Sequence, residues 1–269
     1  MCWNFLFIKK ISITRVYKIG PINLIIPCHA ARFMKTFMTM NNELKRVGLL
    51  GGTFDPVHNG HLDLARKTTQ LFNLQKVLFV PVSQSPHKLD IRPTSSLHRV
   101  TMLELALNKK IKFSIELSEV DNGGVSYTIE TLSRLKERYP DWELFLILGA
   151  DAFLLMDTWK SFTDILKLCH VLVSTRPGVK LGVPDKLIQT LGLKNFQLDN
   201  NNLILPMTLN TTLEKTIRLY QIPTQNISSR EIRGKVQEEK EIKNLLPPAV
   251  DHYIMQHQLY RAESPPTKV

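Results

Sequence analysis

The chain has 269 residues, of which 43% are hydrophobic, and it carries a formal net charge of +11. That length and hydrophobic content suffice for the core of one domain. Six basic residues precede the first acidic residue, Glu43, so more than half of the net charge lies in the leader. The three cysteines have neither paired nor metal-binding spacing, which excludes a disulfide framework and predicts a reducing, cytoplasmic location. They are Cys2, Cys28 and Cys169.

Residues 1–42 contain none of the motifs described below, and we interpret them as an N-terminal extension outside the domain. A signal peptide is disfavoured because the apolar stretch Trp3–Ile8 precedes the charges instead of following them. The apolar stretch Pro21–Ala31 is too short to span a bilayer. Translation from an upstream start codon, with Met38 or Met40 as the working start, explains the extension. An organelle transit peptide is the alternative.

Between residues 47 and 174, short apolar runs alternate with helical patterns. Strands are expected at Val47–Leu50, Val77–Val80, Phe113–Leu117, Leu144–Leu148 and Val171–Ser174. Helices are expected near residues 60–72, 96–108, 127–139 and 159–168. Such alternation predicts an α/β fold with a Rossmann-like, doubly wound parallel sheet, in which ligands bind outside the carboxyl ends of the strands.

The remainder of the chain has a weaker pattern. Residues 179–215 show little periodicity, and the Asn-rich stretch Asp199–Asn202 marks a loop. Ser228 and Ser229 open a helix that runs to about Gln237, and a final helix follows the prolines at 247 and 248. We therefore expect a small C-terminal helical portion.

The most informative segment runs from Gly51 to Leu62 and reads Gly-Gly-Thr-Phe-Asp-Pro-Val-His-Asn-Gly-His-Leu, directly after the first expected strand. The glycines let the backbone turn sharply and approach a ligand. His61 falls in the first turn of the next helix, where free N–H groups and the helix dipole favour an anion. The segment is neither a Walker loop nor a dinucleotide fingerprint. Zinc binding by His58 and His61 is the alternative, but no cysteine or third histidine lies at ligand spacing.

This segment resembles the N-terminal signature of nucleotidyltransferases with a His-x-Gly-His motif, and most closely that of the bacterial nicotinate mononucleotide adenylyltransferases. Seven further motifs follow in family order, so the resemblance covers residues 45–261 as one catalytic domain and leaves residues 262–269 as a tail. They are Ser85-Pro86-His87-Lys88, Arg99 with Met102-Leu103, Ser126-Tyr127-Thr128, Gly149-Ala150-Asp151, Thr158-Trp159, Arg176-Pro177-Gly178 and the run from Ile227 to Arg233.

The resemblance implies transfer of the adenylyl group of ATP to nicotinate mononucleotide, giving deamido-NAD and pyrophosphate in NAD biosynthesis. Mg²⁺ bound with ATP is the implied cofactor; no protein metal site, nucleic acid or membrane partner is expected. The implied ATP site consists of Gly51, Gly52, Thr53, Phe54, His58, His61, Lys88, Ser228, Ser229 and Arg233. The implied site for nicotinate mononucleotide consists of Ser83, Tyr127, Thr128, Asp151, Trp159 and Lys160.

Three residues carry the implied catalysis. His58 and His61 would donate hydrogen bonds to the α- and β-phosphates and stabilise the charge of the transition state. Arg233 would bind the leaving pyrophosphate. Asp55 is expected to fix the loop as a hydrogen-bond acceptor.

On the acceptor side, Trp159 would stack on the nicotinate ring, and the backbone N–H groups of Thr128 and Lys160 would hold its carboxylate. Two positions depart from the family pattern. Ser83 stands where relatives often have Asn touching the mononucleotide. Arg230 replaces a common Thr or Ser, a departure that should matter little if its side chain points outward.

Two other functions are weighed against this one. The phosphopantetheine adenylyltransferases usually show Thr-x-Gly-His where this chain has His58-Asn59-Gly60-His61, and they lack the Thr-Trp pair in this position. A nucleic-acid-binding protein is suggested by the basic charge alone, without aromatic and basic residues interleaved in a binding module.

Overall fold

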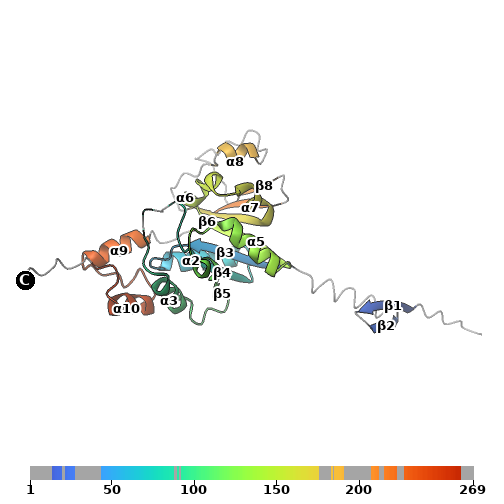
Figure 1. The fold of residues 1–269 in the computed structure, drawn as a ribbon, viewed down its shortest axis with the longest axis horizontal. Coiled ribbons are helices and arrows are strands. Elements are labelled where there is room, and N and C mark those ends of the chain that lie inside the picture. Colours follow the sequence, from blue (N-terminus) through green and yellow to red (C-terminus); the bar gives the residue numbers. More distant parts are fainter. Residues whose placement is uncertain are drawn as a thin grey trace, which may run out of the picture. The chain divides into compact units, whose positions relative to one another are not determined.

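The computed structural model describes residues 14–19, 22–27, 44–87, 90, 92–175, 183, 185–190, 207–211, 215–222 and 227–261 (Figure 1). The chain divides into two units, Met1–Leu44 and Lys45–Val269. In the first unit, β1 (Thr14–Ile19) and β2 (Ile22–Pro27) pair as an antiparallel hairpin, which the sequence did not predict. That residues 1–42 form an extension of a catalytic domain spanning residues 45–261 stays our proposal.

A seven-stranded sheet forms the centre of the second unit. Its spatial order is β5-β4-β3-β6-β7-β9-β8, and only β8 runs antiparallel to its neighbour. The strand order reverses between β3 and β6, and in such sheets ligands bind at this switch point, outside the carboxyl ends of the strands. The strands are β3 (Lys45–Gly52), β4 (Lys76–Pro81), β5 (Phe113–Ile115), β6 (Trp142–Gly149), β7 (Cys169–Thr175), β8 (Met207–Asn210) and β9 (Thr216–Gln221).

All five expected strands are confirmed, whereas β8 and β9 were not predicted. The third expected strand ends early, at Ile115, because Leu117 is the residue that caps the short helix α4 (Ser118–Asn122). The Asp199–Asn202 loop, the Arg176-Pro177-Gly178 motif and the tail 262–269 lie outside the described residues.

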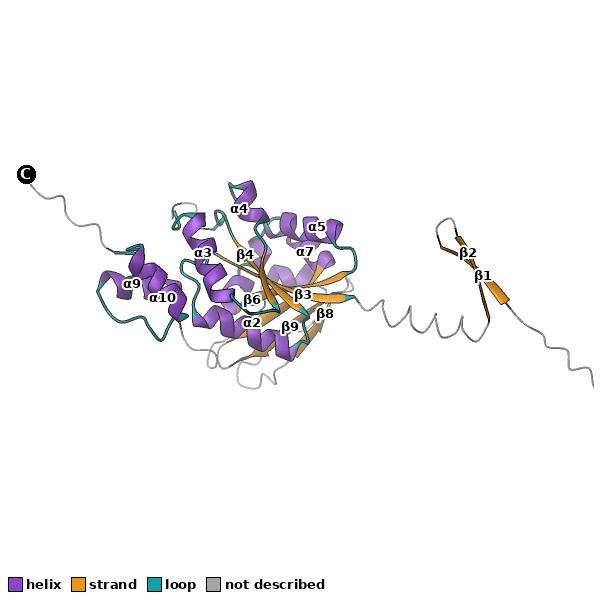
Figure 2. Cartoon of the chain, turned by 90° about the horizontal axis from the view of Figure 1, so that it is seen from below, coloured by secondary structure: helices purple, strands orange, loops and turns teal. Residues whose placement is uncertain are grey.

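Helices cover both faces of the sheet, as a doubly wound fold requires (Figure 2). The four expected helices are present, but the last begins at Phe162 instead of residue 159. Ser161, which precedes it, has a left-handed backbone (φ +51°) and follows a 3₁₀ turn. Besides α4, the helices are α2 (Asn59–Leu71), α3 (Ser96–Leu107), α5 (Thr128–Arg138), α6 (Ala150–Phe153), η1 (Met156–Thr158), α7 (Phe162–Leu168), α8 (Asp185–Thr190), α9 (Ser229–Gln237) and α10 (Pro248–Gln256).

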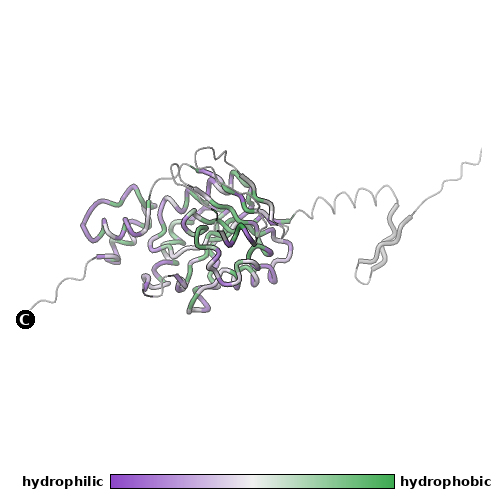
Figure 3. Tube along the Cα trace, turned by 90° about the horizontal axis from the view of Figure 1, so that it is seen from above, coloured by the Kyte–Doolittle hydropathy of each residue, from purple (hydrophilic) through white to green (hydrophobic). Residues whose placement is uncertain are grey.

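Strand alternation divides the interior into two cores. Leu144, Leu146 and Leu148 of β6 face the core that α5 and α7 cover, whereas Phe145 and Ile147 face the core that α2, α3 and α9 cover. Hydrophobic residues accordingly concentrate along the sheet in the middle of this unit (Figure 3). Helices α9 and α10 confirm the expected C-terminal helical portion. No helix among the described residues is long and apolar enough to cross a membrane.

Candidate functional site

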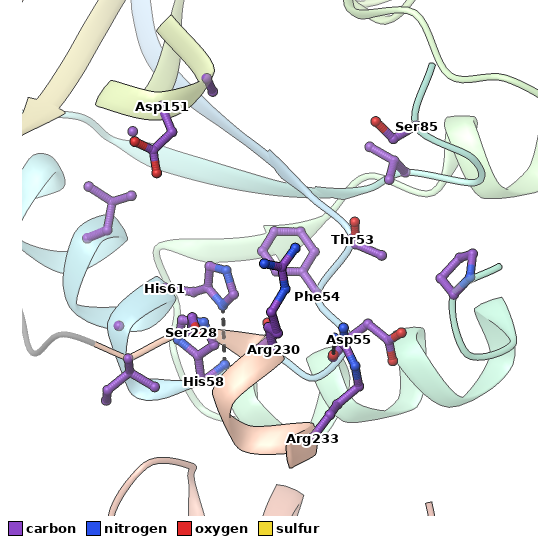
Figure 4. Close-up of a pocket in the computed structure, with 18 of the residues that line it drawn as sticks. Thr53, Phe54, Asp55, His58, His61, Ser85, Asp151, Ser228, Arg230 and Arg233 are labelled. Atoms are coloured by element: carbon purple, nitrogen blue, oxygen red, sulfur yellow. Dashed lines mark hydrogen bonds between the residues drawn. The ribbon is translucent and has the colours of Figure 1, made fainter. Parts of the chain in front are cut away.

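Two adjoining cavities open at the switch point, beyond the carboxyl ends of β3, β4 and β6. The first cavity, of about 850 Å³, is lined by Thr53, Phe54, Asp55 and His58 and by the starts of α2 and α9 (Figure 4). We call residues 53–58 the phosphate loop, after the role expected of them. The second cavity, of about 680 Å³, is lined by β3, the start of α5 and the segment that precedes α7. The two share the wall residues Thr53, Val82, Ser85, Asp151 and Ala152. A ligand in one cavity would therefore meet a ligand in the other at this junction.

Asp55 fixes the phosphate loop, as expected. Its carboxylate is buried and accepts hydrogen bonds from the backbone N–H of Thr94 (3.0 Å) and from the hydroxyl of Tyr260 (2.7 Å). Its backbone carbonyl accepts from Nη1 of Arg233 at 2.6 Å. The loop is thus tied to the segment before α3, to the C-terminal end of the chain and to α9.

Arg99 binds the same loop through its buried side chain. Its side chain is 1% exposed and donates to the backbone carbonyls of Thr53 (2.8 Å), Val82 (2.8 Å) and Thr94 (2.9 Å). A buried guanidinium is costly unless such acceptors satisfy it. The sequence placed Arg99 in a family motif without giving it a role; the structure shows that it joins the loops after β3 and β4.

His58 and His61 come together at the start of α2. Their rings stack with centroids 3.7 Å apart, and the backbone N–H of His58 donates to Nδ1 of His61 at 3.3 Å. Burial, and next the neighbouring His58, lower the pKa of His61 well below its usual 6.5. A neutral ring that accepts at Nδ1 carries its proton on Nε2. His61 is therefore a neutral hydrogen-bond donor in the wall of the first cavity.

Helix α9 docks onto the phosphate loop through its first turn. Ser228 caps the helix by accepting from the backbone N–H of Glu231 (3.1 Å), and Ser229 donates its hydroxyl proton to the carbonyl of Pro56 (2.9 Å). The Ser229 hydroxyl is therefore already engaged, which leaves the backbone N–H as its free donor. Both serines line the first cavity, as does Arg233.

The direction of the Arg230 side chain, which the sequence left open, is shown by the structure. Arg230 lines the first cavity, and Figure 4 shows its side chain pointing from α9 into that cavity instead of outward. The reason is helical geometry: residues three apart share a face, and Arg233 lies on the face that contacts the phosphate loop.

The predicted acceptor residues gather around the second cavity. Tyr127, Thr128, Asp151, Trp159 and Lys160 all line it. The Lys160 ammonium lies 4.3 Å from the centroid of the Tyr127 ring and 2.8 Å from a carboxylate oxygen of Glu130. The aromatic surface and the N-terminus of α5 thus face the same space.

Four predicted residues lie elsewhere than expected or beyond what the structure describes. Gly51 and Gly52 line the second cavity, not the first, because they end β3 before the loop turns. Ser83 is not among the described residues that line either cavity. Its backbone N–H donates to Oγ of Ser126 at 2.9 Å, which holds it in the loop behind the wall. Lys88 lies outside the described residues.

Glu119 is a site residue that sequence reasoning missed. It is buried in the wall of the second cavity, and one oxygen accepts from the Thr131 hydroxyl at 2.6 Å. Burial raises the pKa of its carboxyl group, against the hydrogen bonds from Thr131 and Ser126. A lone Glu in a short, five-residue helix gives no sequence signal for this position.

Across the residues that the structure describes, no group of three or more His, Cys, Asp or Glu side chains could hold a metal ion.

The family model described as Cytidylyltransferase-like matches residues 49–235. A probable nicotinate-nucleotide adenylyltransferase of Moorella thermoacetica is 39% identical over 217 residues, covering 80% of this chain and 92% of the relative. Another, of Desulfitobacterium hafniense strain Y51, is 37% identical over 224 residues, covering 83% and 100%. The solved Plasmodium falciparum nicotinic acid mononucleotide adenylyltransferase complexed with NaAD shares the fold, with a TM-score of 0.60 at 20% identity over 80% of this chain and 97% of that one. The chain belongs to the cytidylyltransferase-like family, among the nicotinate-nucleotide adenylyltransferases.

Proposed function

We propose that this protein transfers the adenylyl group of ATP to nicotinate mononucleotide, giving deamido-NAD and pyrophosphate, a step of NAD biosynthesis in the cytoplasm. Relatives of that name, 37% and 39% identical over nearly their whole length, support the assignment. The observation that carries it is the pair of cavities. One offers cationic and N–H donors, the other an aromatic wall, and they meet at Thr53 and Asp151.

The reaction requires an oxygen of the acceptor phosphate to attack the α-phosphorus of ATP while the bond to the β-phosphate breaks. The attacking phosphate is already ionised near neutral pH, so no general base is needed. Catalysis then depends on positioning two anions and stabilising the charge of the transition state. The wall shared by the two cavities is where the two reacting groups would meet.

His58 and His61 act at the α- and β-phosphates. Since His61 is neutral and carries its proton on Nε2, it can donate a hydrogen bond without first losing or gaining a proton. The N-terminus of α2 adds backbone N–H groups and the positive end of the helix dipole at the same place. Losing one such donor costs roughly 3–4 kcal/mol of transition-state stabilisation.

Arg233, Ser228 and Ser229 bind the leaving pyrophosphate from α9. The bond from Arg233 to the Asp55 carbonyl holds its guanidinium in place and leaves its other N–H groups for phosphate oxygens. Ser229 contributes its backbone N–H at the helix start. Lys88, beyond the described residues, remains a predicted phosphate contact.

Mg²⁺ bound with ATP would supply neutralisation of the triphosphate and orientation of its oxygens. The donor set fits such a cation. Asp151 lies at the junction of the cavities, exposed and without a hydrogen bond to any described residue, so its carboxylate is available to a hydrated cation or to a ribose hydroxyl.

In the second cavity, nicotinate mononucleotide would stack its ring on Trp159 and place its carboxylate at the backbone N–H groups of Thr128 and Lys160. Trp159 is half-buried and packs against the first core, so it presents a fixed surface. Thr128 opens α5, where N–H groups without helical partners point outward.

The test is incubation of the purified protein with ATP, Mg²⁺ and nicotinate mononucleotide, followed by chromatography for deamido-NAD. The same assay on His58→Ala and His61→Ala should show turnover lowered by at least 100-fold, with thermal melting measured alongside to confirm folding. A wild-type protein that forms no dinucleotide would refute the proposed function. Near-normal turnover in either variant would remove that histidine from catalysis.

A further inference from the structure

Arg230 is the cation in the first cavity to which the family pattern gives no role. It occupies the second position of α9, is exposed, and lines the cavity together with Arg233. It makes no hydrogen bond or ion pair with any residue that the structure describes. Figure 4 shows its side chain directed into the cavity.

Three other polar side chains at this end of α9 each make a hydrogen bond within the protein. Arg233 donates to the Asp55 carbonyl, Ser229 donates its hydroxyl proton to the Pro56 carbonyl, and Ser228 caps the helix. Arg230 therefore has its full set of five N–H donors available for a ligand.

The charge of the cavity supports a role with phosphate. Among the described residues that line it, the lysines and arginines are Arg230 and Arg233 alone. Of its two carboxylates, that of Asp55 is turned to Thr94 and Tyr260, which leaves Asp151 at the junction of the cavities. A nucleoside triphosphate brings about four negative charges near neutral pH, and the guanidinium fork matches phosphate oxygens in bidentate geometry. Arg230 thus provides half of the fixed positive charge that faces this anion.

We propose that Arg230 is a second phosphate-binding residue, which grips the β- and γ-phosphates of ATP, and afterwards pyrophosphate, beside Arg233. This inference rests on the proposed use of the first cavity for ATP. Because Arg230 contacts phosphates that are charged both before and during the reaction, its contribution is to binding. Its loss raises KM for ATP and leaves kcat nearly unchanged.

The test compares Arg230→Thr, which installs a residue common in the family, with the control Lys235→Thr. Lys235 lies on the same helix, 3.7 Å from Glu231 and away from the cavity wall, so the control removes the same charge from α9. Equilibrium binding of α,β-methylene-ATP with Mg²⁺ is measured for both, without acceptor, together with displacement by pyrophosphate. We expect Kd for the analogue and for pyrophosphate to rise about tenfold in Arg230→Thr, and less than twofold in Lys235→Thr.

Equal Kd values for the two variants would overturn the proposal. Melting temperatures within about 2 °C of the wild type would show that Arg230→Thr is folded, which its exposed and unbonded side chain predicts. Because the binding measurement omits the acceptor, it separates this inference from the proposed function. If binding of the analogue depends on Arg230 but the protein forms no dinucleotide, only the proposal that nicotinate mononucleotide is the acceptor is refuted.

Discussion

Removing the hydroxyl of Tyr260 should loosen the phosphate loop from a position 205 residues away in sequence. That hydroxyl donates to Oδ1 of Asp55 at 2.7 Å, and the Asp55 side chain is 6% exposed. Burial, and next the Asp55 charge, raise the pKa of Tyr260, so the group stays protonated and acts as a donor. Tyr260→Phe keeps the ring and deletes the hydroxyl, with this bond and its weaker contact to Sδ of Met102 at 4.0 Å.

The expected loss of folding stability follows from the kind of hydrogen bond that Tyr260 and Asp55 form. A hydrogen bond to a charged, buried acceptor contributes about 1.5–3 kcal/mol. For a domain of this size each kcal/mol shifts Tm by about 2–4 °C, so Tm should fall by about 3–12 °C. Asp55 retains its bond from the Thr94 N–H, and the loop should remain folded but less fixed. KM for ATP should therefore also rise several-fold.

Calorimetry and steady-state kinetics on Tyr260→Phe and on Tyr253→Phe test this reasoning. Tyr253 lies on α10, and its hydroxyl forms a hydrogen bond with Nδ1 of His98 on α3 at 2.9 Å. Neither residue lines either cavity. The control should lose some stability and keep its KM. If Tyr260→Phe melts within 1 °C of the wild type and binds ATP normally, the loop does not depend on this bond.

Three further predictions concern other parts of the molecule. Because the pKa of His61 is lowered in the folded state, its contribution to the stability of the folded protein is present above about pH 6.5 and is lost as pH falls toward the folded pKa. The decline of Tm between pH 6.5 and 5 should therefore be shallower in His61→Asn than in the wild type, and parallel curves of Tm against pH would contradict this. A chain that starts at Met40 should keep the activity and Tm of the full chain, and a large loss in either would place residues 1–39 in the domain. The backbone N–H groups of Thr128 and Lys160 are expected to converge on the substituent of the acceptor's ring, where a carboxylate accepts from both, whereas an amide turns a donor of its own toward one of them. The kcat/KM should therefore favour nicotinate over nicotinamide mononucleotide at least tenfold, and comparable values would indicate dual specificity.

The elements that the sequence predicted correctly are those with a strong local pattern. The buried runs of β3, β4, β6 and β7 are nearly all apolar, as strands covered on both faces must be. Strand β9 escaped prediction because it carries charge within the sheet: Arg218 lies between the buried Ile217 and Leu219, with its guanidinium 5.8 Å from the ring of Phe72. The ring of Phe72, far away in sequence, stabilises the arginine within the sheet, and the sequence alone does not show that the two residues are neighbours.

The same distinction separates the parts of the site. The histidine segment is local and was found, whereas the residues that hold it act over long separations. Arg99 reaches Thr53 across 46 positions, and Tyr260 reaches Asp55 across 205. The direction of Arg230 could not be predicted from the sequence because it depends on how α9 docks, which tertiary hydrogen bonds decide.

Transfer of labelled phosphate tests the central claim most directly, namely that the acceptor attacks the α-phosphorus of ATP where the two cavities meet. The protein would be incubated with Mg²⁺, nicotinate mononucleotide and ATP labelled at either the α- or the γ-phosphorus, and the products separated by chromatography. We predict α-label in deamido-NAD and γ-label in pyrophosphate, in equal molar amounts, with both lost in His61→Ala. Label from the γ-phosphorus in the mononucleotide product, or release of orthophosphate without dinucleotide, would contradict the account.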